Sequence, residues 1–282
     1  MSWSGLTHGE TVLAESAIEY FQTRFEPAEI KRFEEVDPKL GWRPSLHFQR
    51  NNHLTIVAEV SEETPYPEIF RIRRAEIVDI QRPMSVYAVC AEVVCLRADK
   101  QVDIKSLQDH GYGLLSVSDH GGVTVRFHCI PLIQHIPETE LVEEMRGLPP
   151  KIRAEIRDCY ERYKNDARSG LEGITQLVEA LVNCAAKRVV TRNWTTNTQL
   201  GTTMASILDK LNSLEECRAA RGAIGGVRGY MTEYRNIAHH APRSKKQAHK
   251  KYRDCHNGFR EGIRKVRSFR EAFKNLGITI TC

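Results

Sequence analysis

The chain has 282 residues, with a formal net charge of +5 and an apolar fraction of 41%. This length predicts about two domains, and the composition allows each a buried core. No apolar run approaches the roughly 18 residues of a membrane-spanning helix, and the first residues lack the pattern of a secretion signal, so we expect neither membrane association nor export.

The first half of the chain mixes helical and strand-like patterns. Alternation of apolar and polar residues indicates strands, and apolar residues every three to four positions indicate helices. Helices are expected at residues 9–24, 65–80, 102–110 and 137–146, and strands at 45–48, 54–60, 85–95, 114–117 and 123–130. These elements predict a mixed α/β domain with a sheet of about four or five strands.

Two segments in this half have the spacing of a metal-dependent nuclease. They are Arg43-Pro44-Ser45 and Ala58-Glu59-Val60-Ser61, and with them residues 10–130 resemble the PD-(D/E)xK nuclease fold. That family holds Mg²⁺ with Pro-Asp on one strand and Asp/Glu-x-Lys on the next. Here Ser45 replaces the aspartate and Ser61 the lysine, so only Glu59 matches. The resemblance implies a degenerate, restriction-endonuclease-like fold without the chemistry, and an unrelated α/β domain is the alternative.

A break at Leu148-Pro149-Pro150 separates this half from a helical region. Residues 1–148 are therefore expected to form a sensing or scaffolding domain, and residues 149–282 a helix bundle, which makes the chain an α+β protein. Helices are predicted at 151–167, 170–190, 203–214 and 245–275, with a polar loop at 193–201. The glycines at 222, 225, 226 and 229 predict either a helix that begins late, near Val227, or a close approach of backbones.

The two halves differ in charge. Residues 151–282 contain 26 Lys and Arg against 13 Asp and Glu, whereas residues 1–150 contain 15 against 23. This asymmetry predicts different partners for the halves, and the basic half suits a polyanion such as nucleic acid. Solvated basic helix faces are the alternative.

Eight cysteines contain no C-x-x-C pair and match no zinc-site spacing. They predict a reduced, cytoplasmic protein, and we expect neither a metal nor another cofactor.

The most specific chemistry lies in Arg235-Asn236-Ile237-Ala238-His239-His240. Pro242 indicates that the helix ends nearby, which places Arg235 in its last turns and His240 at its exit. An imidazole near neutral pKa can move the 2′-hydroxyl proton of RNA or protonate the leaving oxygen, and a guanidinium can stabilise the charge on the phosphorane. Basic residues that favour the dipole of a helix C-terminus are the simpler explanation.

An Arg-x4-His motif at the end of the penultimate long helix of a four-to-five-helix bundle resembles the HEPN superfamily, over about residues 151–275. The resemblance implies a metal-independent endoribonuclease, with a composite active site in a homodimer. Arg235 would stabilise the phosphorane, His240 would act as general acid or base, and Asn236 would hold the site in shape. His239 could replace His240 or cap the helix.

Further expectations follow from the resemblance. Phosphate contacts would come from the last helix, through Lys245, Lys246, Lys250 and Arg253. Many such enzymes are toxins or effectors in bacterial defence or stress, including antiviral defence, which implies a regulatory or antitoxin protein partner. Some relatives carry a modifiable tyrosine where this chain has Pro242, so that mode of control is disfavoured.

Two other functions fit the sequence. One is a non-catalytic module that binds nucleic acid or a partner protein. The other is a Mg²⁺-dependent DNA nuclease that uses Glu59, which the missing second carboxylate disfavours.

Overall fold

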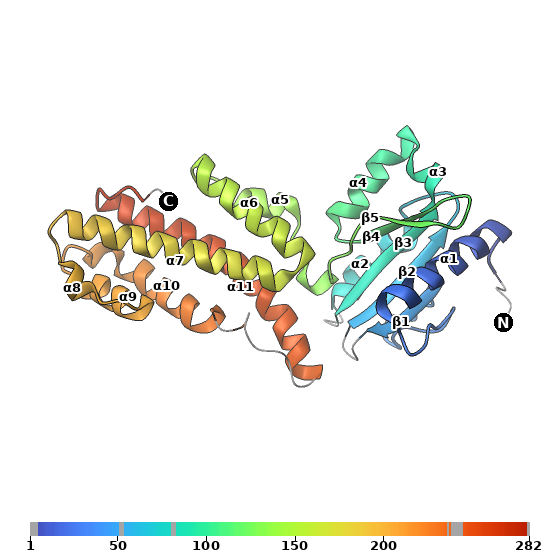
Figure 1. The fold of residues 1–282 in the computed structure, drawn as a ribbon, viewed down its shortest axis with the longest axis horizontal. Coiled ribbons are helices and arrows are strands. Elements are labelled where there is room, and N and C mark those ends of the chain that lie inside the picture. The colour runs from blue at the N-terminus through green and yellow to red at the C-terminus, as the bar shows by residue number, and fades with distance from the viewer. Residues whose placement is uncertain (1–4, 51–53, 80–82, 236, 238–244, 281–282) are drawn as a thin grey trace. The chain divides into compact units, whose positions relative to one another are not determined.

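The computed structural model describes residues 5–50, 54–79, 83–235, 237 and 245–280 (Figure 1). The chain divides into two compact units, residues 1–138 with 243–252, and residues 139–242 with 253–282. The predicted boundary after residue 148 lies within the second unit. The chain is an α+β protein, with a sheet in its N-terminal part and helices after it, which confirms the predicted class.

One mixed sheet forms the centre of the first unit. Its strand order follows the sequence, with a parallel core of β2, β3 and β4 and antiparallel edges β1 and β5. The strands are β1 (Leu46–Arg50), β2 (Leu54–Ser61), β3 (Met84–Ala91), β4 (Gly113–Val117) and β5 (Val123–Phe127). The sheet thus has the expected size.

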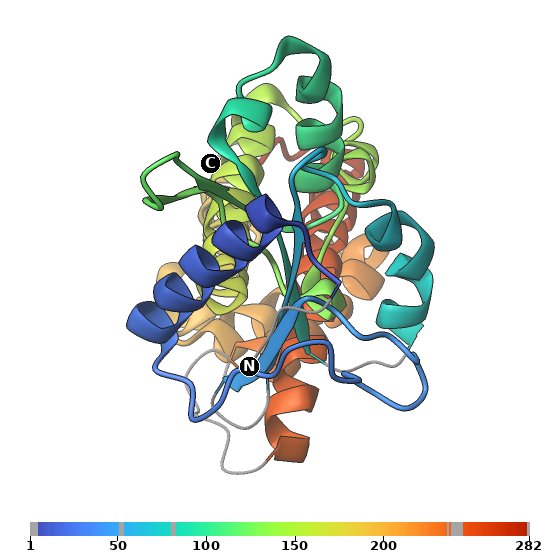
Figure 2. The ribbon, with the colours of Figure 1, turned by 90° about the vertical axis from the view of Figure 1, so that its right-hand side faces the viewer.

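Helices cover both faces of this sheet (Figure 2). Helix α1 (His8–Phe25) packs on one face through Leu13, Ala17 and Phe21. The other face is covered by α2 (Glu68–Asp79), α3 (Glu92–Cys95) and α4 (Gln101–Asp109). Two successive crossovers that advance in one direction across a sheet must lie on one face if both are right-handed, which places α2 and α4 together.

The predicted strand over residues 85–95 is wrong in its last four positions. Its β-branched residues favour a strand, but the parallel ladder with β4 ends at Ala91, opposite Val117. Beyond that pair no strand is bonded to β3, and Glu92–Cys95 forms the short helix α3.

The second unit consists of helices. They are α6 (Pro150–Asn165), α7 (Ala167–Thr191), α8 (Asn197–Leu200), α9 (Met204–Ser213), α10 (Arg221–Tyr234) and most of α11 (Lys245–Asn275), preceded by α5 (Glu138–Glu144). The predicted apolar stripe of α7 is buried, with Ile174 0% and Leu181 1% exposed. No helix in the described part of the chain has both the length and the apolar composition to cross a membrane.

Glycines in α11 bring it close to α7 and α10. A Cβ at Gly258 would lie 2.5 Å from the ring of Tyr234 and 2.9 Å from Leu171. A Cβ at Gly262 would lie 2.5 Å from the Tyr230 hydroxyl and 2.9 Å from the Ile174 side chain. These contacts join α11 to the end of α10, the helix that leads to Arg235.

The glycines of α10 itself do not delay the helix. α10 begins at Arg221, so the predicted start near Val227 is wrong. Its apolar residues Ile224, Val227 and Tyr230 are 0–1% exposed, and their burial overrides the low helix propensity of glycine. A Cβ at Gly222, Gly225 or Gly229 would meet nothing within 4 Å in the described part of the chain, so no described backbone approaches these three positions closely.

Replacing Gly225 with alanine is therefore expected to stabilise the protein by about 0.5–1 kcal/mol, because the alanine restricts the unfolded chain and creates no clash. The midpoint of urea unfolding measures this. Gly258→Ala is the matched control, since its Cβ collides with Tyr234, and it should lower the midpoint. A lower midpoint for Gly225→Ala would contradict the observation that a Cβ at this position meets no described atom within 4 Å.

Candidate functional site

Arg235 lies at the C-terminal end of α10. The last helical residue is Tyr234, and Arg235 is the C-cap, with φ −56° and ψ −39° and its amide bonded to Met231 O at 3.3 Å. This is the helix end at which the sequence placed it. Ile237 N donates to Tyr234 O at 3.2 Å, so the chain turns again just beyond the helix.

The guanidinium of Arg235 pairs with a carboxylate from another helix. Its Nε lies 3.0 Å from Glu179 Oε1 in the middle of α7. The Arg235 side chain is 55% exposed and that of Glu179 is 26% exposed. An ion pair this exposed contributes only about 0–1 kcal/mol to stability, so its main effect is to orient the guanidinium. The exposed side of the Arg235 side chain faces solvent among the described residues.

The phenol of Tyr234 stays protonated at neutral pH. Burial, assisted by the carboxylates of Glu233 and Glu261, raises the pKa of its phenol to about 12. The ring instead packs against Tyr230, with centroids 5.2 Å apart. It stabilises the helix end beside Arg235.

Asn236, His239, His240 and Pro242 lie outside the described residues. Their predicted roles, and the distance between the guanidinium of Arg235 and the imidazole of His240, therefore stay predictions.

The predicted phosphate contacts lie in the first turns of α11. Lys246, Lys250 and Arg253 are exposed, whereas the side chain of Lys245 lies outside the described residues. Arg253 is not without a partner in the protein, so its side chain is not counted as a free cation. Exposure makes the two lysines accessible to a polyanion.

Further along α11, three arginines form ion pairs or hydrogen bonds with the acidic helix α5. Arg264 bonds Glu144 Oε1 through Nε at 2.8 Å and Nη2 at 2.5 Å, and Arg260 pairs with Glu140. Arg267 donates to Glu143 O at 3.0 Å and also to Glu144 O. The middle of α11 is thus neutralised within the protein, so charge counted along the sequence overstates the positive charge that this helix exposes to solvent.

Glu59, the one residue that matches the nuclease pattern, has both carboxylate oxygens engaged in hydrogen bonds within the protein. Glu59 accepts from Trp42 Nε1 at 2.8 Å, from Ser45 N at 3.0 Å and from Ser45 Oγ at 2.7 Å. Burial raises its pKa above the ordinary 4.5, and these hydrogen bonds oppose the rise. Ser61, in the place of the lysine, accepts from the amides of Glu63 and Thr64 in a turn. Glu59 thus fastens the segment before β1 to the sheet.

Across the described ranges, no three His, Cys, Asp or Glu side chains are grouped as a metal site would need. The half-buried His110 instead bonds the Tyr66 hydroxyl through Nδ1, and burial beside Arg74 lowers its pKa from 6.5.

Glu179 is the residue of the site that sequence reasoning missed. It follows the buried Val178 within the apolar stripe of α7, and an acidic residue there is a weak signal. Its partner is far away in sequence, so no local pattern could identify it. Comparison with protein-family descriptions, with curated proteins and with solved structures finds no match for this chain.

Proposed function

We propose that this chain is a metal-independent endoribonuclease of HEPN type, a toxin or effector in bacterial defence or stress. It cleaves RNA by attack of the 2′-hydroxyl on the adjacent phosphate and leaves a 2′,3′-cyclic phosphate and a 5′-hydroxyl. The observation that carries this proposal is the position of Arg235: an exposed guanidinium, held by Glu179, at the end of a bundle helix and five residues before His240.

The proposed chemistry divides between two groups. The terminal nitrogens of Arg235 bind the scissile phosphate and stabilise the charge that grows on its oxygens. His240 takes the proton of the 2′-hydroxyl or gives one to the leaving oxygen, and a second copy of the chain supplies the complementary group. Asn236 orients this pair. The phenol of Tyr234 stays neutral because its pKa is about 12.

The remaining parts have supporting roles. Lys245, Lys246, Lys250 and Arg253 hold the RNA backbone. The first unit is a degenerate nuclease fold in which hydrogen bonds from Trp42 and Ser45 to Glu59 replace a metal site, and it senses a signal or scaffolds a regulatory protein. The protein acts in the cytoplasm.

Incubation of the purified chain with total RNA in EDTA tests this proposal. We expect fragments with 5′-hydroxyl ends, which a kinase labels without prior phosphatase treatment, and 2′,3′-cyclic phosphate ends. The non-catalytic alternative predicts RNA binding without any product between pH ~6 and ~9. Cleavage that requires Mg²⁺ and disappears in Glu59→Gln would favour the metal-dependent nuclease and contradict the proposal.

A further inference from the structure

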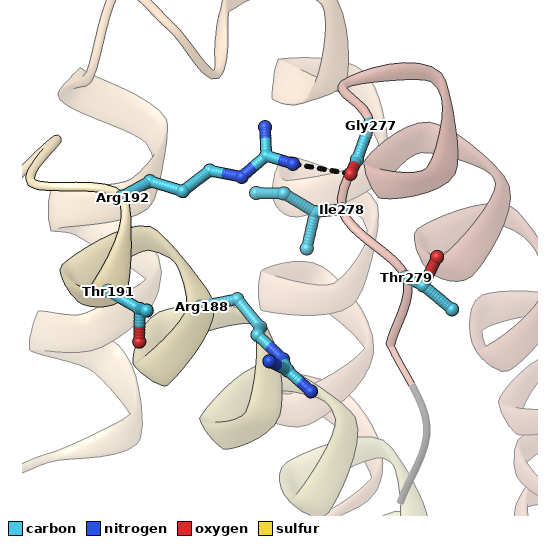
Figure 3. A pocket seen from close by; sticks show the side chains of 6 residues that line it. All are labelled: Arg188, Thr191, Arg192, Gly277, Ile278 and Thr279. Carbon is cyan, nitrogen blue, oxygen red and sulfur yellow. Dashed lines mark hydrogen bonds between the residues drawn. The ribbon is translucent and has the colours of Figure 1, made fainter.

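A pocket of about 300 Å³ lies in the second unit, where the end of α7 meets the segment after α11 (Figure 3). The last turn of α7 and its C-cap form one wall, and the segment after α11 forms the other. The lining residues are Arg188, Thr191, Arg192, Gly277, Ile278 and Thr279.

The two walls are fixed to each other. Arg192 donates through Nη1 to Leu276 O at 3.1 Å and through Nη2 to Gly277 O at 2.5 Å. Gly277 has φ +73°, which turns the chain back from α11, and the next side chain, Ile278, is 2% exposed. Because these contacts hold the segment in place, the pocket does not depend on a ligand for its shape.

The described lining residues carry positive charge and hydroxyl groups, and none of them has a carboxylate side chain. Arg188 is exposed and forms no ion pair or hydrogen bond with a described residue, so its five N–H donors are available. The contacts of Arg192 with the two carbonyls use two of its five donors. Thr279, on the opposite wall, is an exposed residue with a hydroxyl group.

This concentration of charge exceeds what a helix end explains. One basic side chain in the last turn balances the helix dipole, but here Arg188 in that turn is followed by Arg192 at the C-cap, and Figure 3 shows the Arg192 side chain directed to Gly277 and that of Arg188 directed away from it. Lys187 and Lys274 are also exposed, at the ends of α7 and α11. A bound anion would offset this positive charge.

We propose that this pocket binds a phosphate group, which the guanidinium of Arg188 holds by charge-assisted hydrogen bonds while Arg192 adds positive charge to the same wall. A volume of about 300 Å³ is at the small end of ligand sites, so it accepts one phosphate with an attached sugar. The phosphate belongs to a single-stranded RNA or to a small phosphorylated molecule. The site does not rest on the proposed cleavage, because binding needs no reacting 2′-hydroxyl.

Substitution of Arg188 by glutamine tests the site, since Arg188 supports no contact of the fold and its loss should leave the melting temperature unchanged. Arg168→Gln is the matched control, because it removes an exposed arginine from the opposite end of α7. The first probe is a short 2′-O-methyl RNA, which cannot be cleaved and is followed by fluorescence anisotropy. The second is inorganic pyrophosphate, followed by calorimetry.

We expect Arg188→Gln to weaken binding of at least one probe by about tenfold relative to Arg168→Gln, as for loss of a charged hydrogen bond. If Arg188→Gln weakens RNA binding and lowers the slope of log affinity against log salt by about one phosphate contact, the site binds an RNA strand. An effect on pyrophosphate alone assigns it to a small ligand. Equal affinities of the two variants for both probes would overturn the proposal. These measurements can succeed even if no RNA is cleaved, so the two proposals fail separately.

Discussion

Replacing His240 with alanine is expected to lower the rate of RNA cleavage in EDTA by about 10²- to 10⁴-fold, because the substitution removes the group that transfers the proton. The measurement is the initial rate of product formation from a labelled RNA across the neutral pH range. The wild-type rate should vary with pH near the pKa of an imidazole, and that dependence should disappear with the side chain. RNA affinity should be unchanged.

Two further histidine substitutions sharpen this result. His120→Ala removes an exposed imidazole from the turn between β4 and β5 and should leave the rate unchanged. His239→Ala separates the neighbouring histidines, and a large loss there with none in His240→Ala would move the acid–base role to His239. Full activity in a chain that lacks both imidazoles would reject histidine chemistry altogether.

The parts of the fold that the sequence predicted well are those with long, regular patterns. The helix predicted at 170–190 corresponds to α7, in which Ile174, Leu177 and Leu181 recur every three to four residues and are all buried. The last helix was predicted with its observed bounds, because Phe259 and Phe269 mark its apolar face over many turns.

The errors arose where contacts distant in sequence decide the structure. The strand β3 ends at Ala91 because its partner β4 ends there, and nothing in residues 92–95 encodes the length of β4. α10 begins at Arg221 despite its glycines, because the surrounding helices bury Ile224 and Val227. Local propensity is a weaker influence than burial in both cases.

The candidate site shows the same division. Arg235 and its place at a helix end could be predicted from the motif and from Pro242. Its pairing with Glu179 could not, and neither could the pairing of Arg264 with Glu144, which withdraws part of the basic helix from solvent. Both pairs join residues on different helices, so only the folded chain brings them together.

The pair formed by Arg235 and Glu179 leads to the second large effect. Arg235→Ala should reduce cleavage by about 10²- to 10³-fold, the usual loss when a donor to a developing oxyanion is removed. Arg235→Lys should recover part of the rate, since it keeps the charge but not the planar fork. Glu179→Gln should cost less than about tenfold, because an exposed ion pair is worth at most about 1 kcal/mol.

A double-mutant cycle identifies which of the two side chains acts on RNA. If Glu179 acts only by orienting Arg235, its substitution should have no further effect in the Arg235→Ala background. Asp209→Asn is the matched control. Asp209 in α9 pairs at 2.6 Å with Arg228, which lies on α10, the helix that ends at Arg235, and its substitution should leave cleavage unchanged. A loss in Glu179→Gln as large as that in Arg235→Ala would mean that the carboxylate itself contacts the reacting groups. The guanidinium would then be its support, and the assignment of roles proposed for this site would be reversed.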